Sequence, residues 1–84
     1  MEKPENLGKA WTYKEEDQLL EELSKNIPVK LIAQNHKRTN SGIQARQKLI
    51  AYKLYLKKIS IEEIIDKTKL DELCIHKVIQ KYEN

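Results

Sequence analysis

The stretch HKRTNSGIQARQKLIAYKLYLKK, residues 36–58, is both strongly basic and rich in aliphatic side chains. It contains no Asp, Glu or Pro, and Thr39 is a residue type that commonly caps a helix N-terminus. The sequence therefore predicts one long helix from Asn40 to about Lys58. Such a helix has to pack its aliphatic residues against other helices and still present a basic surface.

Rotation by 100° per residue separates the side chains of this helix into faces. One stripe, within about 40° of Ile43, is expected to face the preceding helices and contains Ile43, Gln47, Ile50 and Leu54. The opposite side carries Ser41, Ala45, Lys48 and Tyr52, with Gln44 on the shoulder. A second apolar side contains Leu49, Tyr52, Leu56 and Ile59. We therefore expect an amphipathic first half and a second half that is apolar nearly all round.

The residues before this helix predict two shorter helices. Thr12 and Glu15 have the spacing of a capping box, which indicates a helix over residues 13–25. Its apolar stripe contains Leu19, Leu20 and Leu23, with Trp11 expected to fold back onto it. Pro28 suits the first turn of a second helix, which should end near residue 36.

The residues after Lys58 predict two more helices. Ser60 and Glu63 repeat the capping-box spacing before a helix over residues 61–67, and Asp71 is placed to cap a helix over residues 72–82. The apolar side chains of these helices are Ile61, Ile64, Ile65, Leu73, Ile75, Val78 and Ile79, with Leu70 and Ile75 spaced as a hydrophobic staple. They need a surface to bury against, and the second apolar side of the long helix supplies one. The alternative is that this side forms a homodimer.

The chain is thus expected to be all-α, with a three-helix unit whose long third helix also receives two C-terminal helices. Residues 1–9 are expected to form a flexible arm, residues 10–58 the three-helix unit, and residues 59–84 the C-terminal helical pair. Eighty-four residues make one small domain with a modest core.

Charge is segregated along the chain. Residues 1–29 carry a net charge of −3, residues 30–58 carry +8 with no acid, and residues 59–84 carry −2. A basic middle between acidic ends is typical of a surface that binds a polyanion. The alternative is a solvated basic helix in a lysine-rich protein.

The polar end of the long helix provides the candidate contacts to DNA bases, namely Asn40, Ser41, Gln44 and Lys48. Asn, Gln and Lys read base edges, and the small Ala45 allows close approach in a major groove. The candidate contacts to the phosphate backbone are Lys9, Lys30, Lys37, Arg38 and Thr39. Neutralisation of about four phosphates predicts a slope near −3.6 for the logarithm of affinity against the logarithm of salt concentration.

The sequence resembles the Myb/SANT-like helix-turn-helix domain in three segments that occur in the same order. These are WTYKEEDQLL (11–20), IAQNHKRT (32–39) and GIQAR (42–46). The closest variant is the compact one seen in bacterial and large-DNA-virus proteins, and the resemblance covers roughly residues 10–54. It implies a right-handed three-helix fold whose third helix enters the DNA major groove. Within that pattern the structural residues are Trp11, Ile43, Arg46, Ile50 and Leu54.

The resemblance also implies roles for particular positions. Trp11 is the first of three spaced aromatic core positions, and Val29 and Gln47 stand at the other two. Gln47 departs from the family, which buries an apolar side chain there, so it lies either at the edge of the core or against DNA. Arg46 is expected to pair with an acid of the first helix (Glu15, Glu16 or Asp17), with a DNA contact as the alternative.

No arrangement typical of catalysis is present, so we expect no enzyme activity, cofactor, metal site or small-molecule substrate. Cys74 and His76 are two residues apart on a helix and point to different faces, and zinc would require more ligands. Cys74 is expected to be a small buried residue, and both His36 and His76 are expected at the surface or partly packed.

No apolar run approaches the roughly 20 residues needed to cross a bilayer, and residues 1–11 lack the apolar core of a secretory signal. We therefore expect an intracellular, DNA-associated protein without a membrane partner, acting in transcription regulation or genome organisation. A homodimer or a larger protein assembly remains open. The alternative function is a SANT-like protein-interaction module. Binding of RNA or structured single strands is a third reading, although no aromatic stacking platform is evident.

Overall fold

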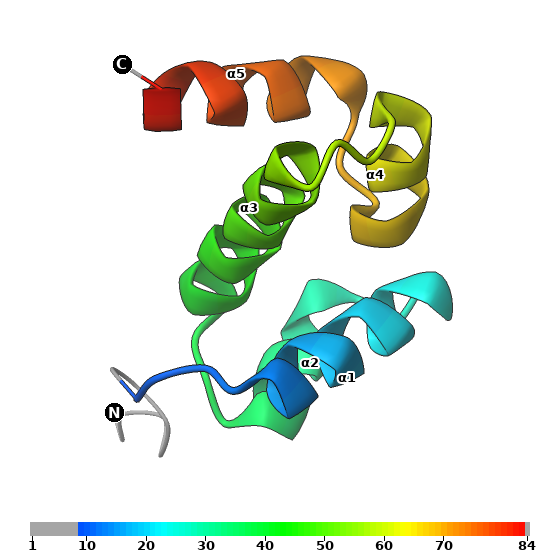
Figure 1. Ribbon diagram of the computed structural model, residues 1–84. Helices are drawn as coiled ribbons and strands as arrows, with labels where there is room; N and C mark the ends of the chain where they lie inside the picture. Colours follow the sequence, from blue (N-terminus) through cyan, green and yellow to red (C-terminus); the bar gives the residue numbers. More distant parts are fainter. Residues whose placement is uncertain (1–8, 84) are drawn as a thin grey trace.

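A computed structural model describes residues 9–83 and contains five α-helices and no strand in that range (Figure 1). The helices are α1 (Tyr13–Ser24), α2 (Val29–His36), α3 (Asn40–Leu56), α4 (Ile61–Thr68) and α5 (Glu72–Glu83). The prediction of an all-α, five-helix chain is confirmed, and every helix ends within two residues of its predicted end. Of the predicted arm, only Lys9 lies within the described residues.

The predicted caps explain where four of the five helices begin. Thr12, Thr39, Ser60 and Asp71 each accept a hydrogen bond from the backbone N–H three residues later, at 3.1, 2.9, 3.3 and 2.7 Å respectively. At α2 the cap position is Pro28, which makes no side-chain hydrogen bond of this kind. Short-range chemistry therefore sets the helix boundaries in both halves of the chain.

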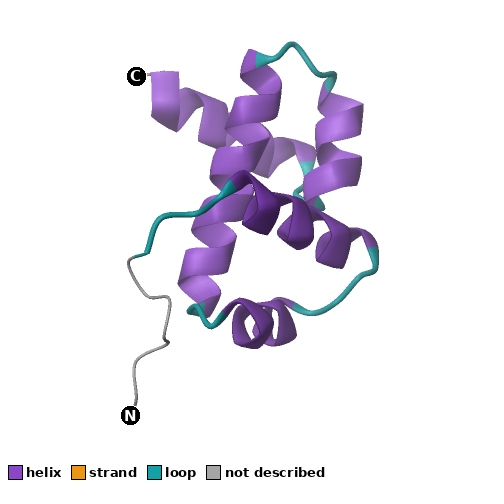
Figure 2. Cartoon of the chain, turned by 60° about the horizontal axis from the view of Figure 1, so that its bottom comes forward, coloured by secondary structure: helices purple, strands orange, loops and turns teal. Residues whose placement is uncertain are grey.

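Helix α3 runs through the middle of the molecule and contacts each of the other four helices (Figure 1). Helices α1 and α2 pack on its N-terminal half, and α5 crosses it with Val78, Lys81 and Tyr82 beside residues 41–48. In Figure 2, α4 returns beside the C-terminal half of α3, and α1 also contacts α4. The long helix is thus shared between an N-terminal and a C-terminal group of helices, as its two apolar sides predicted.

Two apolar clusters meet along α3. The first consists of the buried residues Leu19, Leu23, Ile32, Ala33, Ile43 and Ile50. The second consists of the buried residues Ala51, Ile64 and Ile75 with partly buried aliphatic neighbours, among them Ile61, Ile65, Leu70 and Ile79. Leu54 packs against both clusters. Truncation of this one side chain therefore weakens both halves of the core.

Two leucines expected in the second apolar interface are instead exposed, Leu56 by 58% and Leu73 by 65%. Leu56 follows the fully buried Ala51 by five positions, and Leu73 precedes the buried Val78 by five positions. Five positions rotate a side chain about 140° around a helix, which turns both leucines away from the cluster.

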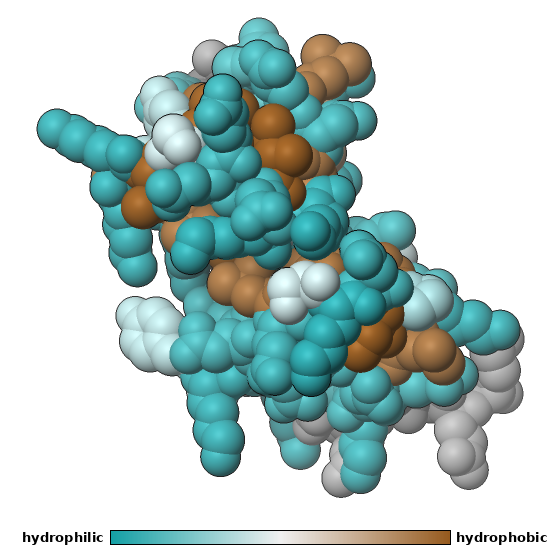
Figure 3. Space-filling view, turned by 90° about the vertical axis from the view of Figure 1, so that its right-hand side faces the viewer, coloured by the Kyte–Doolittle hydropathy of each residue, from teal (hydrophilic) through white to brown (hydrophobic). Residues whose placement is uncertain are grey.

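Figure 3 views the side of α4, where hydrophilic side chains cover most of the surface and separate apolar patches remain between them.

Gln47 belongs to the core. It is 6% exposed, and its Nε2 donates a hydrogen bond to the backbone carbonyl of Thr68 at the end of α4. Thr68 is fully buried, and its hydroxyl donates to the carbonyl of Ile64 at 2.7 Å. The amide at this position ties α3 to α4, and it does not face solvent.

Candidate nucleic-acid interface

All four candidate base contacts lie on the first half of α3 and are exposed: Asn40, Ser41, Gln44 and Lys48. Ala45 beside them is also exposed. Gly42, in the first turn of α3, approaches the Thr39 cap, where an added Cβ would lie 3.1 Å from Oγ1. The first half of α3 therefore presents exposed polar side chains on a helix that is capped by Thr39.

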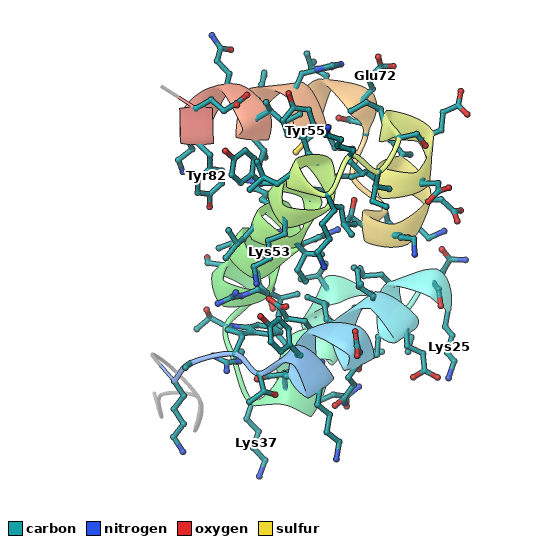
Figure 4. The ribbon with its side chains drawn as sticks, in the orientation of Figure 1. Lys25, Lys37, Lys53, Tyr55, Glu72 and Tyr82 are labelled. Atoms are coloured by element: carbon teal, nitrogen blue, oxygen red, sulfur yellow. The ribbon has the colours of Figure 1, made fainter. Side chains whose placement is uncertain are left out.

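Helix α5 flanks this face of α3, which the sequence had suggested would be uncovered. A hollow of about 260 Å³ lies between the two helices and is lined by Ser41, Gln44, Ala45, Lys48, Val78, Lys81 and Tyr82. Tyr82 of α5 points toward α3 (Figure 4), and its ring stacks on Tyr52 with centroids 4.9 Å apart. The predicted polar patch is thus one wall of a groove, and α5 forms the other.

Arg38 differs from its predicted place. Its side chain is only 7% exposed, and its guanidinium donates to both carboxylate oxygens of Glu15, at 2.8 and 2.9 Å. It also donates to the carbonyls of Lys9 and Ala10, at 3.0 and 3.4 Å, and lies 4.3 Å above the Trp11 ring. With its donors directed inward, Arg38 joins the chain before α1 to the turn after α2. Its prediction as a phosphate contact is therefore corrected.

His36 was expected at the surface or partly packed, and it is buried with 4% exposure. Nδ1 lies 2.9 Å from a Glu15 oxygen, and Nε2 contacts a Glu22 oxygen. The ring stacks on Trp11 at 5.5 Å between centroids, and Asn35 Nδ2 donates to the second oxygen of Glu22 at 2.9 Å. Because these partners are 14 and 21 residues away in sequence, no local pattern revealed them.

The Arg38 guanidinium holds the pKa of the Glu15 carboxyl below its usual value of 4.5. Burial of the carboxyl acts in the opposite direction, and the hydrogen bond from His36 lowers the pKa further. The charged form of Glu15 is therefore part of the folded arrangement.

Two more cations of the basic middle are directed to α1. Arg46 Nη1 lies 3.0 Å from Glu16 Oε2, which is one of the pairings expected for this arginine. Lys53 Nζ lies 3.0 Å from the same oxygen and reaches toward α1 in Figure 4. Glu16 is 8% exposed, so its charge is enclosed by these two partners.

The remaining exposed cations of residues 30–58 are all lysines. Lys30, Lys48, Lys57 and Lys58 are exposed and form no ion pair within residues 9–83. Lys37 is exposed and points away from the helices in Figure 4. Lys9 is exposed while its carbonyl accepts from Arg38, and Thr39 is partly buried as the α3 cap. Lysines thus supply the outward-facing positive charge of this stretch.

Within residues 9–83, no group of three or more His, Cys, Asp and Glu side chains is arranged to hold a metal ion. Cys74 is partly buried, and His76 is exposed beside Glu72 at 3.4 Å. None of the helices in this range combines the length and apolarity needed to cross a bilayer. Comparison with family models, curated proteins and solved structures finds no match to this chain.

Proposed function

We propose that this chain is a non-catalytic binding module for duplex DNA and that the first half of α3 enters the major groove, as the Myb/SANT-like resemblance implies. The observation that carries the proposal is the grouping of Asn40, Ser41, Gln44 and Lys48 on one exposed end of a helix whose other faces are packed. No acidic side chain lines the hollow beside them. Glu15 and Glu16 of α1 are meanwhile paired with Arg38, Arg46 and Lys53, which reduces their repulsion of DNA.

The residue types at this face favour a particular kind of base reading. Asn40 and Gln44 carry amides, which pair with the N6 and N7 edge of adenine through two hydrogen bonds. Both arginines of the chain are directed to α1 acids, so the two-pronged arginine contact to guanine is not supplied by this face. Each amide–adenine pair is worth roughly 1–3 kcal/mol of discrimination. We therefore expect the preferred site to contain adenines at the positions that α3 reads.

Lys9, Lys30 and Lys37 are the proposed contacts to the phosphate backbone, with Thr39 and the N–H groups of the α3 N-terminus beside them. Because Arg38 is committed to Glu15, about three lysine–phosphate contacts remain from this set. The expected slope of log affinity against log salt is then about −2.7. Affinity should fall about 40-fold between 50 and 200 mM salt.

Fluorescence anisotropy with a labelled mixed-sequence duplex at 50 and 200 mM salt tests this function. The informative variants are Asn40→Ala/Gln44→Ala, which should flatten the preference among duplex sequences, and Lys48→Ala, which should weaken binding. The melting temperature of each variant should stay close to that of the wild type, because all three residues are exposed. A large drop for Lys48→Ala would contradict its assignment as a surface contact. Absence of binding at 50 mM salt would contradict the proposal.

The second candidate function is a protein-interaction module of the SANT kind, and a different surface favours it. A hollow of about 430 Å³ at the end of α3 is lined largely by apolar side chains, including Tyr55, Leu56, Ile59 and Ile61. Its exposed Leu56 (58%) is a side chain that a protein partner would bury. If the chain fails to bind duplex DNA, Leu56→Lys tests this reading, because it should disrupt a self-association or partner complex detected by sedimentation.

A further inference from the structure

Helix α5 brings two lysines to the groove beside the proposed base-reading face. A second hollow of about 160 Å³ is lined by Lys48 of α3 and by Cys74, Lys77, Val78 and Lys81 of α5. It adjoins the hollow of about 260 Å³, because Lys48, Val78 and Lys81 line both. Three lysines and no acid therefore surround one continuous groove. None of the three forms an ion pair with another residue of the described range 9–83.

The charges of α5 are separated around its axis. At 100° per residue, Lys77 and Lys81 lie within about 100° of the buried Val78 on one side, whereas Glu72 and Glu83 lie about 120–140° away on the other. Glu72 contacts His76 at 3.4 Å, and both side chains are largely exposed. Helix α5 thus turns its lysines to the groove and its acids away from it.

The groove has firm walls. Ile75 and Val78 are 0% and 5% exposed, and Ile75 belongs to the second apolar cluster, which fixes the middle of α5. The Tyr82–Tyr52 stack fixes its C-terminal end on α3. The backbone positions of Lys77 and Lys81 relative to Lys48 are therefore set by packing, and only the flexible lysine stems need to adjust to a ligand.

We propose that this groove between α3 and α5 binds the sugar–phosphate backbone of the same duplex, with Lys77 and Lys81 as phosphate contacts. The inference rests on the proposed function of α3. A major groove about 12 Å wide is filled by one helix of about 10–12 Å diameter. The strand that borders the groove then lies beside α3, where α5 stands. A lysine ammonium suits a phosphate as a compact point charge.

The lysines of α5 change the expected response to salt. Two more phosphate contacts raise the total from about three to about five, and the slope steepens from about −2.7 to about −4.5. Loss of both contacts should lower affinity about 60-fold at 0.1 M salt, if the non-electrostatic part is unchanged. The salt slope is a better measure than the affinity at one salt concentration. A distorted fold could lower the affinity, but it would not reduce the slope by the amount expected for the loss of two phosphate contacts.

The experiment compares the salt-dependent duplex affinity of three proteins. The test variant is Lys77→Gln/Lys81→Gln. The matched control is Lys25→Gln/Lys67→Gln, which removes the same net charge from the far side of the molecule, where Lys25 and helix α4 lie in Figure 4. We expect the test variant to lose about 1.8 from the magnitude of the slope and the control to lose little. Equal behaviour of the two variants would overturn the groove proposal and leave the α3 proposal standing.

Cys74 gives a second measurement on the unmutated chain. It is the only cysteine, it is partly exposed, and it lines the groove with Lys48, Lys77 and Lys81. Duplex at ten times its Kd should slow alkylation by neutral iodoacetamide about tenfold, because only the free protein reacts. Unchanged alkylation despite saturated binding would overturn the groove proposal. Absence of duplex binding by the wild type would overturn both proposals. If the α5 variant weakened binding and Asn40→Ala/Gln44→Ala kept the sequence preference of the wild type, the phosphate contacts of α5 would stand and base reading by Asn40 and Gln44 would be overturned.

Discussion

The two halves of the chain share one local form and differ in what supports it. In each half an eight-residue helix (α2 or α4) is followed by a lysine with left-handed backbone, and a capped longer helix comes next. The lysines are Lys37 with φ 55° and Lys69 with φ 61°. The caps of the longer helices are Thr39 and Asp71. Both halves therefore use the same local arrangement, a left-handed lysine after the short helix and a side-chain cap on the next helix.

The buried polar side chains at these turns are ionisable in one half and uncharged in the other. Helix α2 ends at the buried His36, which lies between Glu15 and Glu22, and Arg38 two residues later is also buried. Helix α4 ends at the buried Thr68, whose partners are the Ile64 carbonyl and the Gln47 amide. No ionisable side chain is buried in α4 or α5.

The cations of the basic stretch, residues 30–58, have different surroundings in the folded chain. Three cations of residues 30–58 are directed to α1 and secure the first half. Lys48 is exposed on α3, and Lys77 and Lys81 of α5 line the same hollow. The net charge of residues 30–58 therefore overstates the positive charge that this stretch exposes, because three of its eight cations are paired with acids of α1.

The largest expected effect on stability comes from the Arg38–Glu15 ion pair of the first half. Arg38→Ala leaves the carboxylate of Glu15 without its guanidinium partner, and we expect a loss of about 3–5 kcal/mol in the free energy of unfolding. Urea denaturation followed by circular dichroism measures it. Lys30→Ala is the control, because it removes the same charge from an exposed position of α2 and should change stability by less than about 0.5 kcal/mol. If Arg38→Ala weakened DNA binding without loss of stability, Arg38 would be a phosphate contact after all.

The side chain shared by both halves gives the next effect. Leu54 packs against both apolar clusters, so Leu54→Ala should cost about 2–5 kcal/mol as a core truncation. Leu56→Ala makes the same chemical change two residues later at a side chain that is 58% exposed, and it should fall within about 0.5 kcal/mol of the wild type. Both are measured by urea denaturation. Similar costs for the two variants would show that the assignment of faces on α3 is wrong.

A smaller effect should appear in acid and should arise in the first half. Because the folded pKa of Glu15 lies below its usual value of 4.5, its contribution to stability is present above that value and is lost as pH falls through the folded pKa. The free energy of unfolding measured between neutral pH and pH 3 should therefore decline. Glu15→Gln should be less stable than the wild type at neutral pH and should show a shallower decline. Identical pH profiles for the two proteins would contradict this role of Glu15.

The fold was largely predictable because its signals are short-range. The caps at Thr12, Thr39, Ser60 and Asp71 lie three residues from their donors, and apolar spacing identified which helices share α3. The exposure of Leu56 and Leu73 was missed, because the count of apolar residues around a helix does not show how much of its circumference a neighbour covers.

The site was less predictable because its contacts span long separations. Arg38 pairs with an acid 23 residues away, and Lys53 pairs with one 37 residues away. Adjacent in sequence, Lys37 and Arg38 looked alike as backbone contacts, yet one is exposed and the other buried. The spacing of Lys77 and Lys81 places them on one side of α5, but only the crossing of α5 over α3 brings that side to Lys48.

The smallest effect compares the two turns directly. Lys37→Gly and Lys69→Gly each replace a left-handed residue that carries a Cβ, and each should stabilise the chain by about 1 kcal/mol, because glycine adopts this conformation without steric cost. Lys69→Gly also removes the exposed Lys69–Asp66 ion pair at 3.9 Å, but such a surface pair contributes little to stability. The variants should differ in binding: Lys37→Gly removes a proposed phosphate contact and should reduce the magnitude of the salt slope by about 0.9, whereas Lys69→Gly should leave the slope unchanged. Thermal unfolding and anisotropy measure the two properties on the same samples. Equal slopes for both variants would remove Lys37 from the interface while keeping the turn assignment intact.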